Sequence, residues 1–291
     1  MRTLIINNKN DGKKLNNILL KEFPNLSINS VYKALRKKDI RVNNIKVSEN
    51  VVLHTGDTLS VYISDDVLFG QVSVDKVYED DNILVVNKPI GLEVTGSDSL
   101  TTILSKLYGF DILPCHRLDR NTSGLTIFAK NSQALDIMLE KFKNHEIEKH
   151  YVCRVYGIPQ VQHQVLNAFL FKDTKKSIVY VSDTPKKGYL NIVTEYNVIS
   201  SDKKNNTSIL EVILHTGRTH QIRAHLAHIG LPIVGDGKYG INEVNKNFNC
   251  KTQNLVSYLL KFNFNTDSGI LNYLNGKEIK IDLPKFSSKP T

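Results

Sequence analysis

The chain has 291 residues, enough for two domains or one large one, and a formal net charge of +9. Its three cysteines form no CxxC pair, no apolar run is long enough to cross a membrane, and the first residues lack a signal-peptide core. These features argue against a disulfide-bonded secreted scaffold and a membrane protein, and we expect a soluble, cytoplasmic chain with reduced thiols.

The basic charge is concentrated near the start of the chain. Residues 1–64 hold eleven Lys and Arg against five Asp and Glu, a net of +6 out of the total of +9. A segment that is this basic for its length favours binding to phosphate groups.

Residues 12–63 have the pattern of a small α+β unit. Apolar residues at helical spacing predict a first helix through Phe23, ended by Pro24, and a second helix that opens at 26–29. Alternating runs predict short strands, at 40–42, 46–47 and 59–62. The second helix and the strand after it carry the candidate RNA contacts Lys33, Arg36, Lys37, Lys38 and Arg41. The alternative is that this basic face is only a solvated helix surface.

This pattern resembles the small RNA-binding domain first known from ribosomal small-subunit protein four. In that module a basic helix and the following Arg-Val-Asn turn lie against RNA, so the resemblance implies an RNA-binding domain over residues 1–64. Residues 65–76 are interpreted as a linker, residues 77–285 as a second domain, and residues 286–291 as a loose tail.

The second domain mixes strands and helices without strict βαβ alternation, which predicts an α+β fold. Apolar runs predict strands, at 83–89, 125–129, 151–156, 189–198 and 208–214. Helical patterns are found at 99–107, 131–142 and 219–229. The helix over 131–142 is expected to begin at a capping Asn131 and to turn one apolar face inward: Ala134, Leu135, Met138, Leu139 and Phe142.

One short polar run, residues 116–124 (His-Arg-Leu-Asp-Arg-Asn-Thr-Ser-Gly), places a single carboxylate just before a predicted buried strand. A strand holds such a loop rigid, and catalytic groups often lie on loops of this kind. Arg117 and Arg120 flank Asp119, and positive neighbours favour an ionised carboxylate, which suits a nucleophile that meets a polyanion. The alternative is a plain turn, because Asp, Asn, Ser and Gly all favour turns.

The run 116–124 resembles the signature HRLDxxTSG of the RluA-type pseudouridine synthases. The resemblance covers residues 12 to about 284 and implies a catalytic domain with a mixed, largely antiparallel central sheet and flanking helices. It further implies an enzyme that isomerises uridines in structured RNA, with Asp119 as the nucleophile. The RluC/RluD-like subgroup carries the same N-terminal module, so large-subunit ribosomal RNA is the expected substrate and transfer RNA the alternative. Asn121 stands where Asp is commoner in the family.

Three further segments resemble motifs of this family. Residues 87–92 match NKPxGL, although Glu-Val-Thr-Gly at 93–96 replaces the usual Val-His-Pro run. Residues 149–151 match KxY, which implies that Tyr151 stacks on the target uracil and acts in proton transfer. Residues 215–225 match TGRxHQIRxH, which implies that Arg223, or failing that Arg218, pairs with the catalytic Asp. The candidate substrate contacts near the active site are His116, Arg117, Arg218, His220 and Gln221.

The resemblance implies an isomerisation without metal or nucleotide cofactor, and we expect a monomer. Residues 235–240 match GxGxxG, but an Asn-rich stretch rather than a clear helix follows, and no acid lies about twenty residues on. The histidines at 215, 220, 225 and 228 lack HExxH spacing and have no cysteine nearby, which disfavours zinc.

Two other classes of function remain open from the sequence. The N-terminal module alone is compatible with a non-catalytic RNA-binding factor for ribosome assembly. A glycoside or nucleoside hydrolase would need a second carboxylate, and none lies close to Asp119 in the sequence.

Overall fold

The computed structural model describes residues 2–23, 26–63, 74–97 and 99–286, and its chain forms two compact units, Met1–Ser73 and Val74–Thr291. Most of the predicted linker, all but the first residue of the predicted tail, and Pro24 lie outside the described residues. The first strand of the second unit begins at Asp75, inside the range that was predicted to be linker.

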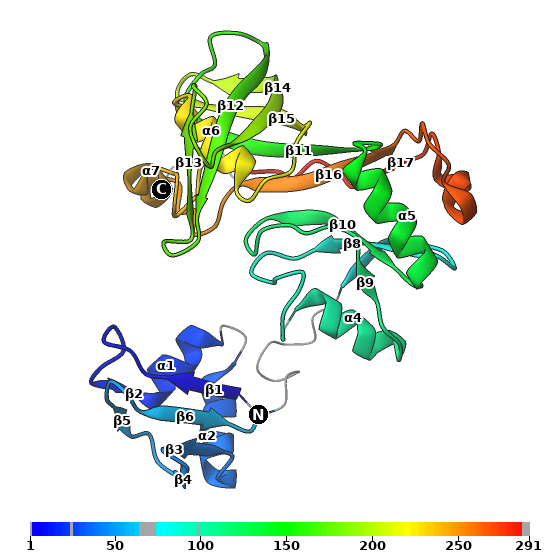
Figure 1. Ribbon diagram of the computed structural model, residues 1–291. Helices are drawn as coiled ribbons and strands as arrows, with labels where there is room; N and C mark the ends of the chain where they lie inside the picture. Colours follow the sequence, from blue (N-terminus) through cyan, green and yellow to red (C-terminus); the bar gives the residue numbers. More distant parts are fainter. Residues whose placement is uncertain (1, 24–25, 64–73, 98, 287–291) are drawn as a thin grey trace. The chain divides into compact units, whose positions relative to one another are not determined.

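The first unit packs two helices, α1 (Leu15–Glu22) and α2 (Ile28–Lys37), against a small sheet (Figure 1). The sheet has the strand order β1-β6-β3-β4, with bounds Arg2–Ile5, Thr58–Val61, Ile40–Val42 and Ile45–Lys46. A separate pair joins β2 (Lys13–Lys14) to β5 (Val52–Leu53). The Ser27 hydroxyl caps α2 by accepting a hydrogen bond from the Ser30 amide at 3.1 Å.

The turn between β3 and β4 follows from its two asparagines. Asn43 and Asn44 both have positive φ, at 50° and 66°, and they join the paired residues Val42 and Ile45. Two left-handed residues make the tight hairpin turn that matches the twist of antiparallel strands, and Asn tolerates this conformation well. The turn predicted after the second helix is therefore present.

The second unit is built on an eleven-stranded sheet, in which nine strands follow the order β13-β12-β14-β15-β11-β16-β10-β8-β7, while β17 pairs with β16 and β9 pairs with β10 off this path. Its strands are β7 (Asp75–Glu79), β8 (Ile83–Lys88), β9 (Leu113–Pro114), β10 (Ser123–Ala129), β11 (Ile147–Tyr156), β12 (His163–Asp173), β13 (Ile178–Ser182), β14 (Leu190–Asp202), β15 (Thr207–Leu214), β16 (Leu255–Phe262) and β17 (Glu278–Lys280). The pairing of β10 with β16 is parallel, and the other pairings in the sheet are antiparallel. The predicted mixed, largely antiparallel α+β fold is confirmed.

Helices cover parts of this sheet (Figure 1). They are α4 (Leu100–Tyr108), α5 (Ser132–Lys143), α6 (Gln221–His228), α7 (Asn242–Asn247) and a 3-10 turn at Gly269–Leu274. Asn131 caps α5 as predicted, because its side-chain oxygen accepts a hydrogen bond from the Ala134 amide at 2.8 Å. Leu139 was expected to face inward, but it is 47% exposed, so the buried stripe of α5 is narrower than the apolar pattern suggested.

Helix α7 corrects a second expectation. The Asn-rich stretch after residues 235–240 was predicted not to be a clear helix, yet residues 242–247 form a short one. Tertiary contacts override the poor helix propensity of Asn here, because the side chain of Asn245 accepts from the Gly235 amide at 2.6 Å and donates to the Asp236 carbonyl at 3.0 Å.

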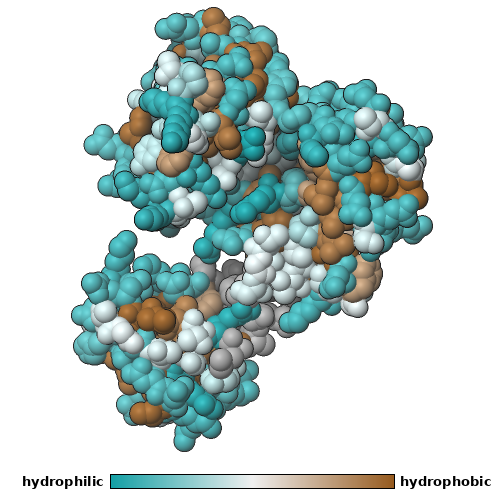
Figure 2. Space-filling model, in the orientation of Figure 1, coloured by the Kyte–Doolittle hydropathy of each residue, from teal (hydrophilic) through white to brown (hydrophobic). Residues whose placement is uncertain are grey.

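Both faces of the central strands are buried. In β8, Leu84 and Val86 belong to one apolar cluster, whereas Ile83 and Val85 belong to another on the opposite face. This explains the continuous apolar run that predicted the strand, since a strand covered on both sides shows no alternation. The face of the molecule in Figure 2 is mostly hydrophilic, with its apolar residues in small separate patches. None of the described helices is long and apolar enough to cross a membrane.

Candidate active site

The loop that carries Asp119 is fixed at both ends to neighbouring structure. Before it, the Nε2 atom of His116 accepts a hydrogen bond from the Ile127 amide of β10 at 3.0 Å. After it, the Thr122 hydroxyl accepts from the Gln253 side chain at 2.6 Å. Burial lowers the pKa of His116 to about 3, so its ring is neutral at physiological pH. The predicted substrate contact His116 therefore also holds the loop in place.

Gly124 is required at the point where β10 enters the sheet. Its parallel pairing places it opposite Ser257 of β16, and a Cβ atom would lie 2.1 Å from the Ser257 carbonyl oxygen. Its φ of +111° is also in the region that other residues avoid. The glycine that ends the motif 116–124 thus lets two backbones approach closely.

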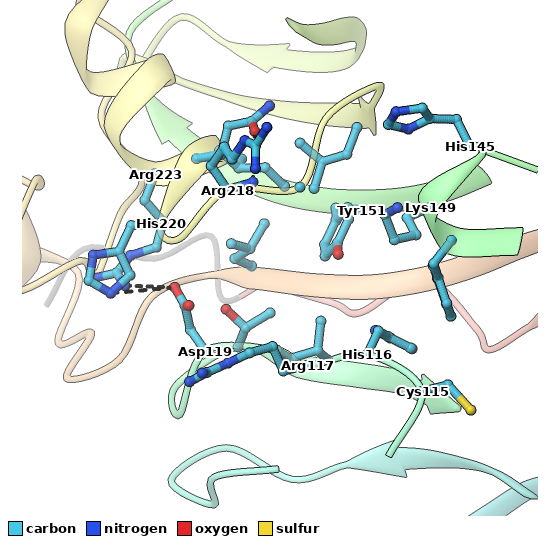
Figure 3. Close-up of a pocket in the computed structure, with 18 residues that line it drawn as sticks. Cys115, His116, Arg117, Asp119, His145, Lys149, Tyr151, Arg218, His220 and Arg223 are labelled. Carbon is cyan, nitrogen blue, oxygen red and sulfur yellow. Dashed lines mark hydrogen bonds and ion pairs between the residues drawn. The ribbon is translucent and has the colours of Figure 1, made fainter. Parts of the chain in front are cut away.

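Asp119 forms an ion pair with Arg223, as predicted. The Nη1 atom of Arg223, on α6, donates to the Asp119 Oδ2 atom at 2.8 Å, although the two residues lie 104 positions apart in the chain. Figure 3 shows Asp119 directed toward Arg223 and His220 across the pocket. A charge-assisted hydrogen bond of this length fixes one carboxylate oxygen and leaves the other for chemistry.

Arg223 is itself held by a second carboxylate that was not predicted. Its Nε and Nη2 atoms donate to the two oxygens of Asp236 at 2.6 and 3.0 Å, a bidentate arrangement. Asp236 is fully buried and also accepts from the Lys238 and Tyr239 amides. Burial acts to lower the pKa of Arg223, but the hydrogen bonds and charges of Asp236 and Asp119 raise it overall. The segment 235–240 therefore serves to present Asp236.

His220 completes the group around Asp119. Its Nε2 atom lies 4.0 Å from the Asp119 Oδ2 atom, and its Nδ1 atom lies 2.9 Å from the Tyr239 hydroxyl. Burial lowers the pKa of His220, against the opposing effect of the Asp119 charge. Its backbone is left-handed, with a φ of 54°, which is uncommon for a residue other than glycine.

The neighbouring Gln221 uses its amide within the protein. Its side-chain oxygen accepts from the Thr216 hydroxyl and the Arg218 amide, and its nitrogen donates to Val193 and Thr194. Gln221 lines the pocket, but these four hydrogen bonds tie the loop before α6 to β14. Arg218 and Arg117 are exposed and also line the pocket.

These residues enclose a cavity of about 330 Å³. Asp119, Arg223 and His220 lie at one end, Tyr151 projects from β11 near the middle, and Lys149 and His145 lie beyond it (Figure 3). Tyr151 is 5% exposed, and burial together with the Asp119 charge raises its pKa. The cavity therefore combines a carboxylate, a guanidinium and a protonated phenol ring.

Lys88 explains how the segment 87–92 contributes. Its buried ammonium donates to the carbonyl oxygens of Pro89, Leu92 and Arg120 at 3.0, 2.7 and 3.1 Å. Burial lowers the pKa of Lys88 to about 8, whereas the Asp119 charge acts to raise it. The motif that resembles NKPxGL thus holds the loop of Asp119 in place through the hydrogen bond from Lys88 to the Arg120 carbonyl. The spacing of residues along the chain does not reveal this role.

The predicted contacts of the first unit lie on α2, at its C-cap residue Lys38 and on β3. Lys33, Arg36, Lys37 and Lys38 are exposed, whereas Val31 and Leu35 of the same helix are buried. The Arg41 guanidinium lies over the Tyr62 ring, 4.9 Å from its centroid. One face of α2 therefore carries exposed basic side chains.

The four histidines between 215 and 228 are not gathered at one point. His215 contacts Glu195 at 2.7 Å, His225 contacts Thr194 at 3.0 Å, and His228 contacts Asp183 at 2.7 Å. Among the described residues, no group of three or more His, Cys, Asp or Glu side chains is placed to hold a metal ion.

Comparison with known proteins defines the class. Residues 82–228 match the RNA pseudouridylate synthase family. Ribosomal large subunit pseudouridine synthase C of Buchnera aphidicola is 30% identical over 92% of this chain and 86% of its own length. The mitochondrial tRNA pseudouridine(32) synthase of Saccharomyces cerevisiae is 32% identical over 80% of this chain. The match covers about half, 51%, of the length of that protein.

Solved structures agree on the fold. The human protein RNA Pseudouridylate Synthase Domain Containing 1 has a TM-score of 0.62 at 22% identity, over 75% of this chain and 89% of that one. The chain belongs to the RNA pseudouridylate synthase family, and within it to the RluA type with RluC-like relatives. It is an isomerase that acts on RNA.

Proposed function

We propose that the chain converts uridine to pseudouridine in large-subunit ribosomal RNA with Asp119 as the nucleophile. The observation that supports the nucleophile most directly is the 2.8 Å ion pair between Asp119 and Arg223 at the end of the cavity. The named relatives from Buchnera, Vibrio and Rickettsia support ribosomal RNA, whereas the yeast relative carries the name of a transfer RNA enzyme.

The target uridine leaves its helix and enters the cavity, because its reacting atoms are inaccessible within a stacked duplex. Asp119 then attacks the ribose C1′ atom, or the reaction passes through a glycal intermediate. The position of the Arg223 side chain is fixed, because it donates two hydrogen bonds to Asp236. Asp119 therefore meets the ribose from a preset position, which is how a rigid site lowers a barrier.

Tyr151 provides the surface on which the uracil ring lies. Its ring lines the cavity between Asp119 and the far end. Because burial and the charge of Asp119 raise the pKa of Tyr151, its hydroxyl is protonated in the resting site and can donate a hydrogen bond. Stacking on an aromatic ring is how proteins hold extruded bases.

Exposed cations supply the affinity for RNA. Arg117 and Arg218 lie at the cavity, and residues 1–64 act as an RNA-binding domain through the basic face of α2. Contacts of this type release counterions from the phosphates, so binding should weaken steeply as salt increases.

The test is tritium release from RNA labelled at uracil C5, using the wild type, Asp119→Ala and the exposed control Asp136→Ala. Wild type and Asp136→Ala should release tritium from ribosomal RNA, and Asp119→Ala should release none while binding RNA with similar affinity. Release from transfer RNA alone would replace the proposed substrate. Tight RNA binding without release by any variant would instead indicate a ribosome assembly factor.

A further inference from the structure

Lys149 is a cation in the cavity that none of the roles above uses. It lies on β11, two residues before Tyr151, and it lines the same cavity (Figure 3). None of the described residues accepts a hydrogen bond from its Nζ atom. Its ammonium instead lies over the Phe142 ring, 5.3 Å from the ring centroid, and beside the neutral His116.

Two other lysines have buried ammonium groups, and each donates hydrogen bonds to several acceptors within the protein. Lys88 donates to three carbonyl oxygens, and Lys141 donates to Glu146 and to both oxygens of Thr266. Burial lowers the pKa of Lys149, and no carboxylate among the described residues acts to raise it. A partly buried amine without an acceptor costs free energy, so its retention points to a ligand that brings the acceptor.

The spacing on β11 indicates which atom of the substrate reaches Lys149. Side chains two residues apart on a strand point to the same face, about 6.8 Å from each other. Asp119 lies on one side of Tyr151 and Lys149 on the other (Figure 3). A uracil ring that stacks on Tyr151 with its ribose beside Asp119 therefore directs its far edge, which bears a carbonyl oxygen, toward Lys149.

Resting on the proposed function, we propose that Lys149 binds the O4 atom of the target uracil and thereby selects uracil over cytosine. An ammonium group only donates hydrogen bonds, and O4 of uracil only accepts them. Cytosine carries an amino group, itself a donor, at the same position. Cytosine would leave the amine and the amino group facing each other without acceptors, and sites of this kind discriminate strongly.

The same contact suits the chemical step. When the C1′–N1 bond breaks, its electron pair stays with uracil, and the negative charge spreads over N1, O2 and O4. A fixed ammonium stabilises that charge. Rotation of the ring about its N3–C6 axis exchanges O4 with O2, so one donor serves both orientations. C5 then bonds to C1′ as the bond between C1′ and the Asp119 oxygen, where one has formed, breaks and regenerates the carboxylate. The C5 proton leaves and N1 takes up a proton, which completes the isomerisation.

The first test compares Lys149→Met with Lys149→Arg and with the exposed control Lys280→Met. Single-turnover rates on an RNA with a mapped target should fall about 100-fold or more in Lys149→Met, as when one charge-stabilising donor is removed, with little change in RNA affinity. Lys149→Arg should recover part of the rate, and Lys280→Met should match the wild type. The midpoint of thermal unfolding should be unchanged or higher in Lys149→Met, because a partly buried ammonium group without an acceptor is removed.

The second test replaces the target with 4-thiouridine, whose sulfur is a weaker acceptor than oxygen. Wild type should react more slowly with 4-thiouridine than with uridine, and Lys149→Met should react with both at similar rates. A wild-type rate in Lys149→Met, or the same preference for uridine over 4-thiouridine in both proteins, would overturn the inference. If wild type releases no tritium from any RNA, the proposed function fails and this inference fails with it.

Discussion

The buried cations of the second unit differ from the exposed cations of the first. In the catalytic unit Arg223 and Lys88 are buried, and each donates to several fixed acceptors. In the first unit Lys33, Arg36 and Lys37 are exposed on one face of a helix. Burial, rather than residue type, decides whether a basic side chain fixes geometry within the protein or stays available for a ligand.

The largest effect should come from Arg223→Met. It leaves Asp236 buried without its bidentate partner and Asp119 without its ion pair, so activity should disappear. Losing one partner of a buried ion pair costs about 3–5 kcal/mol of unfolding free energy. Denaturant unfolding and tritium release measure the two losses.

Arg36→Met is the matched control for Arg223→Met, because it removes the same side chain from an exposed site. It should change the unfolding free energy by less than about 0.5 kcal/mol. Equal destabilisation by the two substitutions would contradict the contrast between the units.

Lys88→Met should have an intermediate effect. Three carbonyls lose their donor and the Asp119 loop loosens, so the single-turnover rate should fall while RNA affinity stays similar. The pKa of Lys88 is lowered to about 8 in the folded protein. Between that pH and its ordinary pKa, the unfolded chain binds the extra proton, so wild type should gain stability relative to Lys88→Met as pH rises. If wild type lost stability relative to Lys88→Met as the pH rose from 8 to 10, the result would contradict this prediction.

The smallest effect on catalysis should come from the combined change of Lys33, Arg36 and Lys37 to Gln. RNA affinity should fall about tenfold at low salt. The negative slope of log affinity against log salt should become less steep by about 2–3. The rate at saturating RNA should not change. An unchanged salt slope would show that this face does not contact phosphates.

Sequence reasoning predicts the parts of the site that lie within one motif. The apolar run that follows residues 116–124 predicts a loop before a strand, and two helix starts, at 26–29 and at Asn131, were predicted and are capped in the structure by Ser27 and Asn131. The pair of Asp119 with Arg223, separated by 104 residues, was expected only from a family resemblance and is present at 2.8 Å.

Other parts depend on contacts that no local pattern encodes. Asp236 lies within residues 235–240, whose GxGxxG pattern suggests only a dinucleotide site. The fold is needed to show that Asp236 accepts two hydrogen bonds from Arg223. Helix α7 was missed because Asn245 is stabilised by tertiary hydrogen bonds rather than by propensity. Strand β12 was missed because its outer face also carries apolar side chains, Val165, Phe169 and Phe171, which obscure the alternation of the buried Leu166, Ala168 and Leu170.

The most direct test of the central claim is to digest RNA after a single turnover with excess enzyme and separate pseudouridine from uridine by chromatography. Wild type should yield one pseudouridine per target, and Asp119→Ala should yield none at an RNA occupancy confirmed to be equal. Pseudouridine formed by Asp119→Ala at the wild-type rate would contradict the assignment of Asp119 as the nucleophile.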